Sequence, residues 1–476
     1  MKSKTTRIVL PQFHLTQICG AFDTGATHID LPDGTSYSIR PKLLPNESAR
    51  PDGKPLWAPR NFNVYPVVLT SDGTLWDEAN VWILESLEGK LSFDMSTFRG
   101  KADDLQHYRN FIDDRGLNAL EFPDNKLLRP TYRYRGFLRV EIDAKRIEWS
   151  TAKRRMSNVV QFYRWLINSK NWVPSNSPWV DKDVYLTSTD HVGRKFSIKA
   201  KSTDIHIHNT KAENPFDDHI NDGGKLRPLS IQEQGWILDA LSRLGNTEQA
   251  LIQAMGLCTG ARLQTVLTIR KQHVLANSES HDVLLQCGPG TGIDTKGNVL
   301  QTIVIPRWLY ISLQSYAHSP RALRRRQKAP GGDIDSQFLF LSQRGVPMYD
   351  AKQRQNLNAG KKLRHEKNGQ AVRAYMTDYI IPMVKVHHNP DFHYRYHDLR
   401  ASFGMNLVDS LMPRIDAGEL TYTRVLAIVQ SRMNHRSPAV TERYLEYRNT
   451  RKLFESAQDA WEAKVQNTVT RMMGVQ

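Results

Sequence analysis

Two short polar segments near the far end of the chain constrain its structure most. Residues 396–404 read Tyr-His-Asp-Leu-Arg-Ala-Ser-Phe-Gly, and residues 433–444 read Met-Asn-His-Arg-Ser-Pro-Ala-Val-Thr-Glu-Arg-Tyr. In the first segment His397 and Arg400 are three residues apart, so one turn of a helix places both on the same face. The segment therefore predicts a proton-transferring group beside a group that binds anions.

The second segment supplies a possible nucleophile. Tyr444 follows His435 by nine residues. A tyrosine hydroxyl is a weak nucleophile near neutral pH, so a catalytic tyrosine needs neighbours that take its proton and stabilise the charge it creates. Histidine and arginine together can do both.

The order of these residues resembles the signature of the tyrosine recombinases, or phage-type integrases. Upstream, residues 258–267 (Cys-Thr-Gly-Ala-Arg-Leu-Gln-Thr-Val-Leu) resemble the first arginine box of that family, and residues 294–298 (Asp-Thr-Lys-Gly-Asn) resemble the turn that carries its lysine. The catalytic residues that the resemblance implies are Arg262, Lys296, His397, Arg400, His435 and Tyr444.

The resemblance implies a role for each residue. Tyr444 would attack a DNA phosphodiester and form a 3'-phosphotyrosyl bond, with both arginines on the non-bridging oxygens. His397 would assist proton transfer from the tyrosine, Lys296 would protonate the leaving oxygen, and His435 would bind the phosphate. The resemblance also implies integrase- or excisionase-type strand exchange of a mobile element. Such an exchange requires neither ATP nor a metal, so no cofactor is expected.

The sequence departs from the family pattern at two places. The family commonly has an acidic residue three positions after its first arginine, and this chain has Thr265 there. Another residue would then have to orient Arg262. Before His435 the chain reads Met433-Asn434 where the family often has Leu-Gly.

Other interpretations of these residues stay open. Taken singly, a buried tyrosine is usually packing, an arginine a salt-bridge partner and a histidine a core residue, and Tyr447 lies close enough to rival Tyr444 as the nucleophile. A type IB topoisomerase-like enzyme would share the tyrosine chemistry. A catalytically silent DNA-binding protein on the same fold is the alternative from another class.

The charge of the chain indicates its partner. A formal net charge of +16 over 476 residues favours a polyanion, because basic surfaces release counterions from nucleic acid. We expect double-stranded DNA attachment sites, a homo-tetramer on DNA and possible accessory DNA-bending or directionality proteins. No apolar run reaches the ~18 residues of a membrane helix, and the resemblance favours a cytoplasmic, nucleoid-associated bacterial protein.

The cysteines and histidines give no metal-binding pattern. Cys19, Cys258 and Cys287 stand far apart and match neither a zinc spacing nor a disulfide framework. His206 and His208 alternate along an expected strand with no third ligand nearby, so a metal site there is disfavoured.

The pattern along the chain predicts a multidomain, mainly α protein. We expect a small strand-containing module over residues 1–74, which either touches DNA outside the core site or only braces the next domain. A helical core DNA-binding domain over 75–174 and a linker over 175–226 would follow. An α+β tyrosine-recombinase catalytic domain with a small antiparallel sheet and a C-terminal tail helix would occupy 227–476.

Several local features support this division. Alternation predicts strands in residues 6–10 and 64–69, and Ser150-Thr151 and Ser230 are expected to cap helices. Residues 411–429 are expected to form a loop near the active site. The residues expected to contact DNA phosphates are Lys153, Arg154, Arg155, Arg164, Arg324, Arg325 and Arg326, for which a solvated charged face is the alternative.

Overall fold

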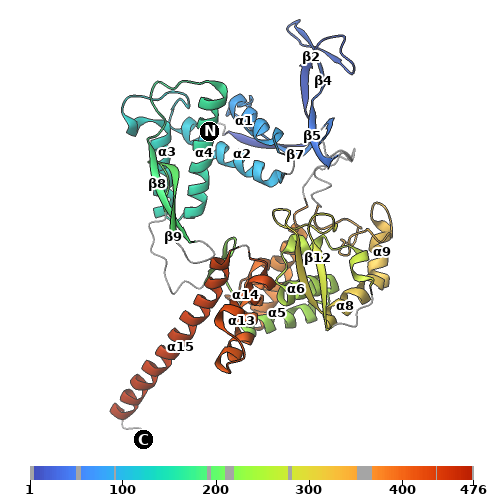
Figure 1. Ribbon diagram of the computed structural model, residues 1–476, viewed down its shortest axis with the longest axis vertical. Coiled ribbons are helices and arrows are strands. Elements are labelled where there is room, and N and C mark those ends of the chain that lie inside the picture. The colour runs from blue at the N-terminus through green and yellow to red at the C-terminus, as the bar shows by residue number, and fades with distance from the viewer. Residues whose placement is uncertain are drawn as a thin grey trace. The chain divides into compact units, whose positions relative to one another are not determined.

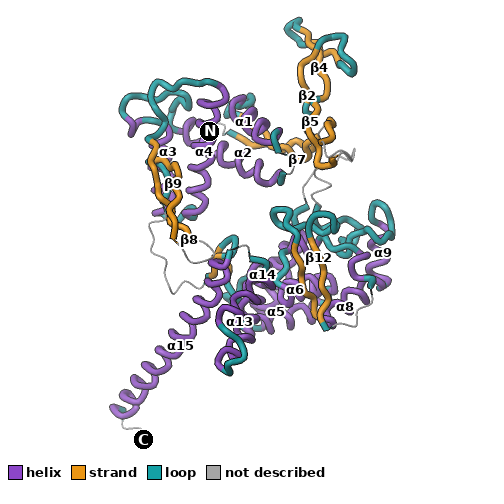
Figure 2. Tube along the Cα trace, in the orientation of Figure 1, coloured by secondary structure: helices purple, strands orange, loops and turns teal. Residues whose placement is uncertain are grey.

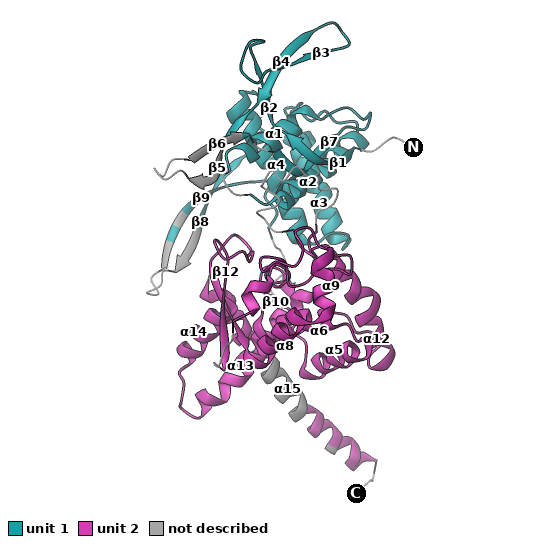
Figure 3. Ribbon diagram, turned by 90° about the vertical axis from the view of Figure 1, so that its right-hand side faces the viewer, with its two compact units in different colours: residues 1–212, 352–365 teal, residues 213–351, 366–476 magenta. Residues whose placement is uncertain are grey.

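The structure is a computed structural model that forms two compact units. It describes residues 5–49, 55–59, 61–90, 93–189, 195–208, 219–276, 281–350, 367–435 and 437–473. Unit 1 comprises residues 1–212 and 352–365, and unit 2 comprises residues 213–351 and 366–476 (Figure 3). Most described residues lie in helices, and the strands pair in small antiparallel sheets (Figure 2). The predicted fold class is confirmed.

Unit 1 begins with strands. They are β1 (Thr6–His14), β2 (Thr16–Cys19), β3 (Thr27–Asp30), β4 (Ser36–Pro41), β5 (Leu43–Ala49), β6 (Pro55–Pro59) and β7 (Asn61–Leu69). The two segments predicted as strands by alternation lie in β1 and β7, and they pair with each other in antiparallel register, with Thr6 opposite Leu69. The order β2-β4-β3 forms a second small sheet, and β5 pairs with β6.

The helices of unit 1 follow these strands (Figure 1). They are α1 (Asp77–Glu88), α2 (Met95–Asp114), the 3-10 turn η1 (Lys126–Leu128), α3 (Pro130–Asp143) and α4 (Trp149–Lys170). The apolar residues Leu105, Tyr108, Phe111 and Ile112 of α2 are buried on one face, and Gly116 follows its end with a positive φ of 60°. The expected Ser150-Thr151 cap is wrong. Glu148 is the N-cap and α4 begins at Trp149, which packs against the hydrophobic core of the unit.

One hydrophobic core of unit 1 runs from Leu15 to Ile207, so β7 and the helices share it. The expected linker, where described, contains two hairpins. β8 (Asp181–Thr189) pairs with β9 (Lys195–Thr203), and β10 (Ile220–Asn221) pairs with β11 (Lys225–Leu226). The domain boundaries proposed from the sequence stay a prediction.

Unit 2 contains the remaining elements. After β10 and β11 these are α5 (Ile231–Leu244), α6 (Thr247–Thr259), α7 (Leu263–Leu267), η2 (Lys271–Val274), β12 (Asp282–Cys287), β13 (Gln301–Pro306), α8 (Arg307–His318), α9 (Pro320–Lys328), α11 (Gln370–Tyr375), the π-helical segment η3 (Met376–Ile380), α12 (Ile381–His387), α13 (Tyr396–Asp416), α14 (Tyr422–Met433) and α15 (Pro438–Met472). β12 and β13 pair in antiparallel register.

The predicted capping box at the start of α5 is confirmed. The Ser230 hydroxyl accepts a hydrogen bond from the Glu233 amide at 3.1 Å, and the Glu233 carboxylate accepts one from the Ser230 amide at 2.8 Å. These two bonds satisfy amides that the first turn of a helix leaves without partners.

The loop expected over residues 411–429 is wrong. α13 continues through Pro413 to Asp416, and α14 begins at Tyr422, so only a short turn separates them. Val425 and Val429 are fully buried in the core shared with α13. Burial of this apolar face stabilises a helix where the turn-forming residues alone predicted a loop.

The tail helix after Tyr444 is part of α15, and the side chains of residues 451–460 lie outside the described set. None of the helices in the described ranges has the length and apolar character to cross a bilayer.

Candidate active site

Tyr444 is fully buried on the second turn of α15. Its ring lies 5.5 Å from that of His435. The ring also packs against α13 at Gly404, where an added Cβ would stand only 2.5 Å from Tyr444 Cε1. The missing side chain of Gly404 therefore provides the space that the tyrosine ring fills.

One carboxylate oxygen joins three of the predicted residues. Oδ2 of Asp222 accepts a hydrogen bond from Arg400 Nε at 3.0 Å and one from the Tyr444 hydroxyl at 3.2 Å, and His435 Nε2 lies 3.2 Å from the same oxygen. Asp222 lies at the turn between β10 and β11. The structure thus brings Arg400, His435 and Tyr444 together around a single anion.

Arg400 is held rigidly by backbone carbonyls. Its Nη1 donates to the carbonyl of Gly260 at 2.7 Å, and its Nη2 donates to the carbonyl of Met433 at 2.5 Å. Gly260 ends α6 with a φ of 64°, which favours glycine, and Met433 ends α14. A planar guanidinium fixed at both tips can present its remaining donors to an anion without reorganising.

His435 is oriented by Thr441 and by the turn before it. The Thr441 hydroxyl lies 2.9 Å from His435 Nδ1, which leaves Nε2 directed at the anion. Asn434 adopts the left-handed conformation, with φ 49°, that asparagine tolerates better than most residues. Its amide donates to Gln301 at 2.5 Å, which ties this turn to β13. Asn434, in place of a glycine, therefore preserves the left-handed turn before His435.

His397 lies one turn before Arg400 and is partly buried. Burial is the main cause that lowers its pKa to about 4, and the charges of Arg400, Arg262 and Lys296 lower it further while Asp222 opposes them. His397 is consequently neutral at neutral pH and able to accept a proton.

The two remaining predicted residues are Lys296 and Arg262. Lys296 is exposed in the turn between β12 and β13, and its Nζ lies 3.5 Å from where a Cβ on Gly223 would be. Arg262 is the N-cap residue of α7, directly after the turn at Gly260. Its charge also acts on Tyr444. Of the six residues predicted from the sequence, Arg400, His435 and Tyr444 contact the Asp222 carboxylate. The inclusion of Arg262, Lys296 and His397 stays a prediction.

The pKa values of Asp222 and Tyr444 are shifted in opposite directions. Burial opposes the charge of Asp222, but the hydrogen bond with His435 and the charge of Arg400 outweigh it and hold its pKa well below the ordinary value. Burial and the adjacent Asp222 raise the pKa of Tyr444 well above 10, although Arg400 and Arg262 act in the other direction. With Asp222 in place, Tyr444 stays protonated at neutral pH.

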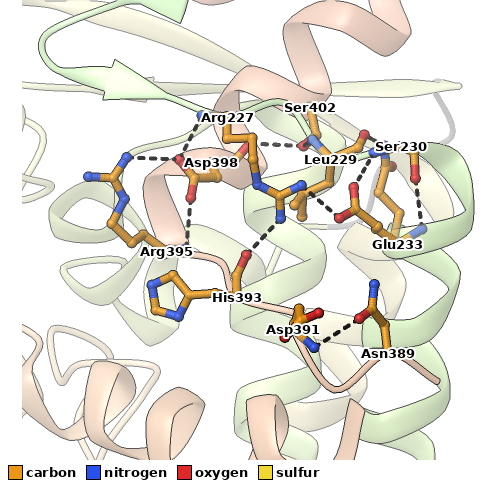
Figure 4. Close-up of polar contacts among 11 residues, drawn as sticks. Arg227, Leu229, Ser230, Glu233, Asn389, Asp391, His393, Arg395, Asp398 and Ser402 are labelled. Carbon is orange, nitrogen blue, oxygen red and sulfur yellow. Dashed lines mark hydrogen bonds and ion pairs between the residues drawn. The ribbon is translucent and has the colours of Figure 1, made fainter. Parts of the chain in front are cut away.

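A network of polar contacts fixes the start of α13 to the chain between β11 and α5 (Figure 4). The Asp398 carboxylate accepts hydrogen bonds from the amides of Arg227 and Arg395, at 3.1 and 2.8 Å. The Ser402 hydroxyl accepts one from the Leu229 amide at 2.8 Å. Because Asp398 and Ser402 flank Arg400 on α13, these contacts set the hairpin that carries Asp222 beside the site.

Three of the four basic residues on α4 that are expected to contact DNA already have partners within the protein. On α4, Arg154 makes two hydrogen bonds to the buried Asp104, Arg155 lies against His107, and Arg164 pairs with Asp181 at 3.4 Å. Lys153 is exposed, with Nζ 5.1 Å from the Trp149 ring centre.

The basic run on α9 is largely internal. Arg325 donates to the carbonyl of Leu341 at 2.6 Å, and Arg326 donates to Asp333 at 2.5 Å and to the carbonyl of Ala317. Both side chains are buried, and the phosphate contacts expected for them are incompatible with that burial. Only Arg324 of the three is exposed.

Sequence reasoning missed Asp222, Thr441 and Gly404. Asp222 stands in an Asn-Asp-Gly-Gly stretch of the expected linker, where the pattern indicates only a turn. Thr441 lies between His435 and Tyr444, and its residue type alone indicates no role there. Thr265, which replaces the expected acidic residue, is buried. The acidic group of the site therefore comes from a different part of the chain.

Replacing Gly404 with alanine is expected to displace the Tyr444 ring. The new Cβ would meet Tyr444 Cε1 at 2.5 Å and Met433 Cε at 3.1 Å, both closer than normal contacts. Overpacking of this kind costs about 1–3 kcal/mol of unfolding free energy. Displacing a reacting group by ~1 Å can lower a rate about 100-fold. Denaturant unfolding and single-turnover DNA cleavage would measure the two effects.

Gly235→Ala is the matched control for this substitution. Gly235 lies inside α5 of the same unit, and a Cβ there would meet nothing within 4 Å. Alanine at such a helical position should stabilise the chain by up to about 1 kcal/mol and leave cleavage unchanged. If both variants had the same unfolding free energy and the same cleavage rate, the packing role of Gly404 would be contradicted.

In the comparisons with known proteins, the chain is similar only to solved structures. No protein-family model and no curated protein matches the chain. The XerH site-specific recombinase bound to palindromic difH substrate is 15% identical, with a TM-score of 0.47 over 81% of this chain and 89% of that one. The Tn1549 transposon integrase in complex with transposon right end DNA is 13% identical, with a TM-score of 0.45 over 76% and 92%. A lambda integrase dimer bound to a COC' core site is 13% identical, with a TM-score of 0.43 over 78% and 94%.

Proposed function

We propose that this chain is a site-specific DNA recombinase that cuts and rejoins DNA through a covalent 3'-phosphotyrosyl intermediate. The observation that carries the proposal is the convergence of Arg400, His435 and Tyr444 on one anionic oxygen. Attack on a phosphodiester requires donors that stabilise the phosphate charge and a nucleophile beside them. Arg400 and His435 are such donors, and the Tyr444 hydroxyl is the nucleophile.

In the proposed reaction the scissile phosphate takes the place of the carboxylate. The Tyr444 oxygen forms a bond to phosphorus, the bond from phosphorus to the 5' oxygen breaks, and the tyrosine proton passes to His397. Lys296 donates a proton to the leaving 5' oxygen. Arg400 and Arg262 stabilise the charge that develops on the non-bridging oxygens, and His435 donates a hydrogen bond to one of them.

The reverse reaction gives strand exchange. The phosphotyrosyl ester keeps the energy of the broken bond, so a 5'-hydroxyl from a second duplex can attack it and release Tyr444. Cutting four strands requires four active sites, and we propose a homo-tetramer on paired attachment sites, with accessory DNA-bending or directionality proteins as further partners. Integration or excision of a mobile element in a bacterial nucleoid is the proposed setting.

The net charge of +16 supports DNA as the substrate. Among the basic residues singled out above, we propose the exposed Lys153 and Arg324 as phosphate contacts; Arg154 is also exposed but is paired with Asp104. We propose that Arg154, Arg155 and Arg164 reach DNA only by exchanging their present partners. Arg325 and Arg326 are not proposed as contacts.

Covalent trapping tests this function. The full chain would be incubated without added metal on a nicked suicide duplex that carries its candidate attachment site. We expect a protein–DNA band that resists denaturation and a free 5'-hydroxyl on the released strand, as mapped by end-labelling. Binding without any band would favour the silent DNA-binding interpretation. Relaxation of supercoiled DNA by the protein without paired sites would favour a type IB topoisomerase-like enzyme.

A further inference from the structure

The anion at the centre of the site belongs to the protein itself. A single oxygen of Asp222 contacts Arg400, His435 and Tyr444, the groups that the proposed reaction assigns to the phosphate and its attacker. Only 6% of the Asp222 side chain is exposed. A buried carboxylate with three such contacts occupies the space between these side chains, unlike an aspartate in a turn that is exposed to solvent.

We propose that Asp222 is an internal substitute for the scissile phosphate, which occupies the active site in the DNA-free protein and has to withdraw before DNA can be cut. This proposal rests on the proposed function and adds its regulation. It assigns an autoinhibitory role to the β10–β11 hairpin.

Charge makes the two anions mutually exclusive. A phosphate at the Asp222 position would accept the same hydrogen bonds from Arg400 Nε and His435 Nε2. If the carboxylate remained in contact with them, two negative charges would stand a few ångströms apart in a buried site, which is strongly unfavourable. DNA binding in the catalytic position therefore selects the withdrawn conformation of Asp222.

The hairpin is constructed so that its tip can move while its strands stay fixed. Ile220 and Leu226 are buried in the core that also contains Tyr444. Arg443 donates to the carbonyl of Asn221 at 2.7 Å, and Arg395 donates to the carbonyl of Lys225. Both sides of the hairpin are thus attached to helices of unit 2.

The tip of the β10–β11 hairpin, in contrast to its strands, has a backbone that can change conformation. Gly223 and Gly224 follow Asp222 with φ of 70° and 158°, conformations that other residues rarely adopt. A pair of glycines allows the backbone to change without a steric penalty. Gly223 also lies against Lys296, so withdrawal of the tip would free space beside the proposed proton donor. The hairpin can release Asp222 without unfolding its strands.

A different role for Asp222 predicts the opposite experimental result. Thr265 occupies the position of the family's acidic residue, so Asp222 could instead orient Arg400 and His435 throughout the reaction. Loss of an orienting carboxylate would slow cleavage. Loss of a substitute anion would make the phosphate site more accessible.

A phosphate titration without DNA tests the proposal first. Melting temperatures of wild type, Asp222→Asn and Asp222→Ala would be measured against inorganic phosphate at constant ionic strength. Without phosphate, both variants should melt at a lower temperature than wild type. At a phosphate concentration about ten times its Kd, the melting temperature of each variant should rise by roughly 3–5 °C, and that of wild type should rise little. An equal response in all three proteins would overturn the proposal.

Asp409→Ala is the control for the loss of an acidic partner. Asp409 lies on α13 and pairs with the buried Arg448 of α15 at 2.5 Å, outside the candidate site. This variant should also melt lower than wild type, but phosphate should not restore it. Equal recovery of Asp409→Ala and Asp222→Ala would show only non-specific binding to an unpaired arginine, and would overturn the proposal.

Suicide-substrate cleavage then measures regulation. If the substitute anion dominates the free protein, Asp222→Asn should reach half-maximal covalent adduct at about tenfold lower DNA concentration, since apparent affinity scales with the competent fraction. Slower adduct formation at saturating DNA, with no gain in affinity, would assign Asp222 a positioning role and overturn the proposal. Absence of adduct in every variant would reject the proposed function, and the phosphate titration would still decide the occupancy by Asp222.

Discussion

The Tyr444→Phe variant is expected to bind its DNA site and to form no covalent adduct. The substitution removes only the hydroxyl that would attack phosphorus. The ring of Tyr444 is fully buried against Gly404 and His435, and phenylalanine fills the same space. The measurement is a denaturing gel of protein and suicide substrate, together with a gel-shift assay of binding.

The fold should tolerate this loss. Within the described residues the hydroxyl donates one hydrogen bond, to Asp222, and Asp222 keeps Arg400 and His435 as partners. Removing a single hydrogen bond to a charged group changes the free energy of unfolding by about 1.5–3 kcal/mol. A folded Tyr444→Phe protein without adduct therefore reports on chemistry.

Tyr447→Phe is the matched control. Tyr447 lies three residues further along α15, is partly buried and packs against the same core. It was the rival nucleophile in the sequence, and its hydroxyl is expected to be dispensable for the adduct. A band that persists in Tyr444→Phe and disappears in Tyr447→Phe would reverse the assignment.

The sequence predicted the parts of the site that depend on local spacing. His397 and Arg400 lie on one turn of α13, and Gly260 forms the left-handed turn that precedes Arg262. The hairpin around Lys296 follows from two apolar strands and the glycines between them. These features result from helix periodicity and turn chemistry, which act over a few residues.

The central anion could not be predicted in the same way. Asp222 and Tyr444 are separated by 222 positions, and their contact depends on tertiary packing of the hairpin against α13 and α15. In the sequence, an aspartate before two glycines indicates a turn and nothing more. Only the folded chain reveals that this turn points into a cationic site.

Charge density was a poor guide to exposure. The run on α9 appeared suited to phosphate, but Arg325 and Arg326 bond to carbonyls and carboxylates inside unit 2. Arginine can satisfy several buried acceptors at once through its five donors. The number of basic residues in a segment therefore does not determine how many of them reach DNA.

Arg400→Lys is expected to lower the rate of adduct formation by about 100- to 1,000-fold, the usual cost of losing one stabilising donor at a developing charge. Lysine keeps the positive charge but loses the planar fork. It cannot bond at once to the carbonyls of Gly260 and Met433 and to the anion, as Arg400 does. Single-turnover cleavage at saturating DNA would measure the loss.

The choice of lysine separates chemistry from folding. Arg400→Ala would leave the Asp222 carboxylate without its arginine in a buried site, and breaking such a pair costs about 3–5 kcal/mol of unfolding free energy. The matched control is Arg448→Lys, because Arg448 is also buried in unit 2 but pairs with Asp409 outside the site. It should lose some stability and retain cleavage. If Arg448→Lys slowed cleavage as much as Arg400→Lys, the rate loss would reflect general damage to the core, and Arg400 would lose its assigned contact with the phosphate.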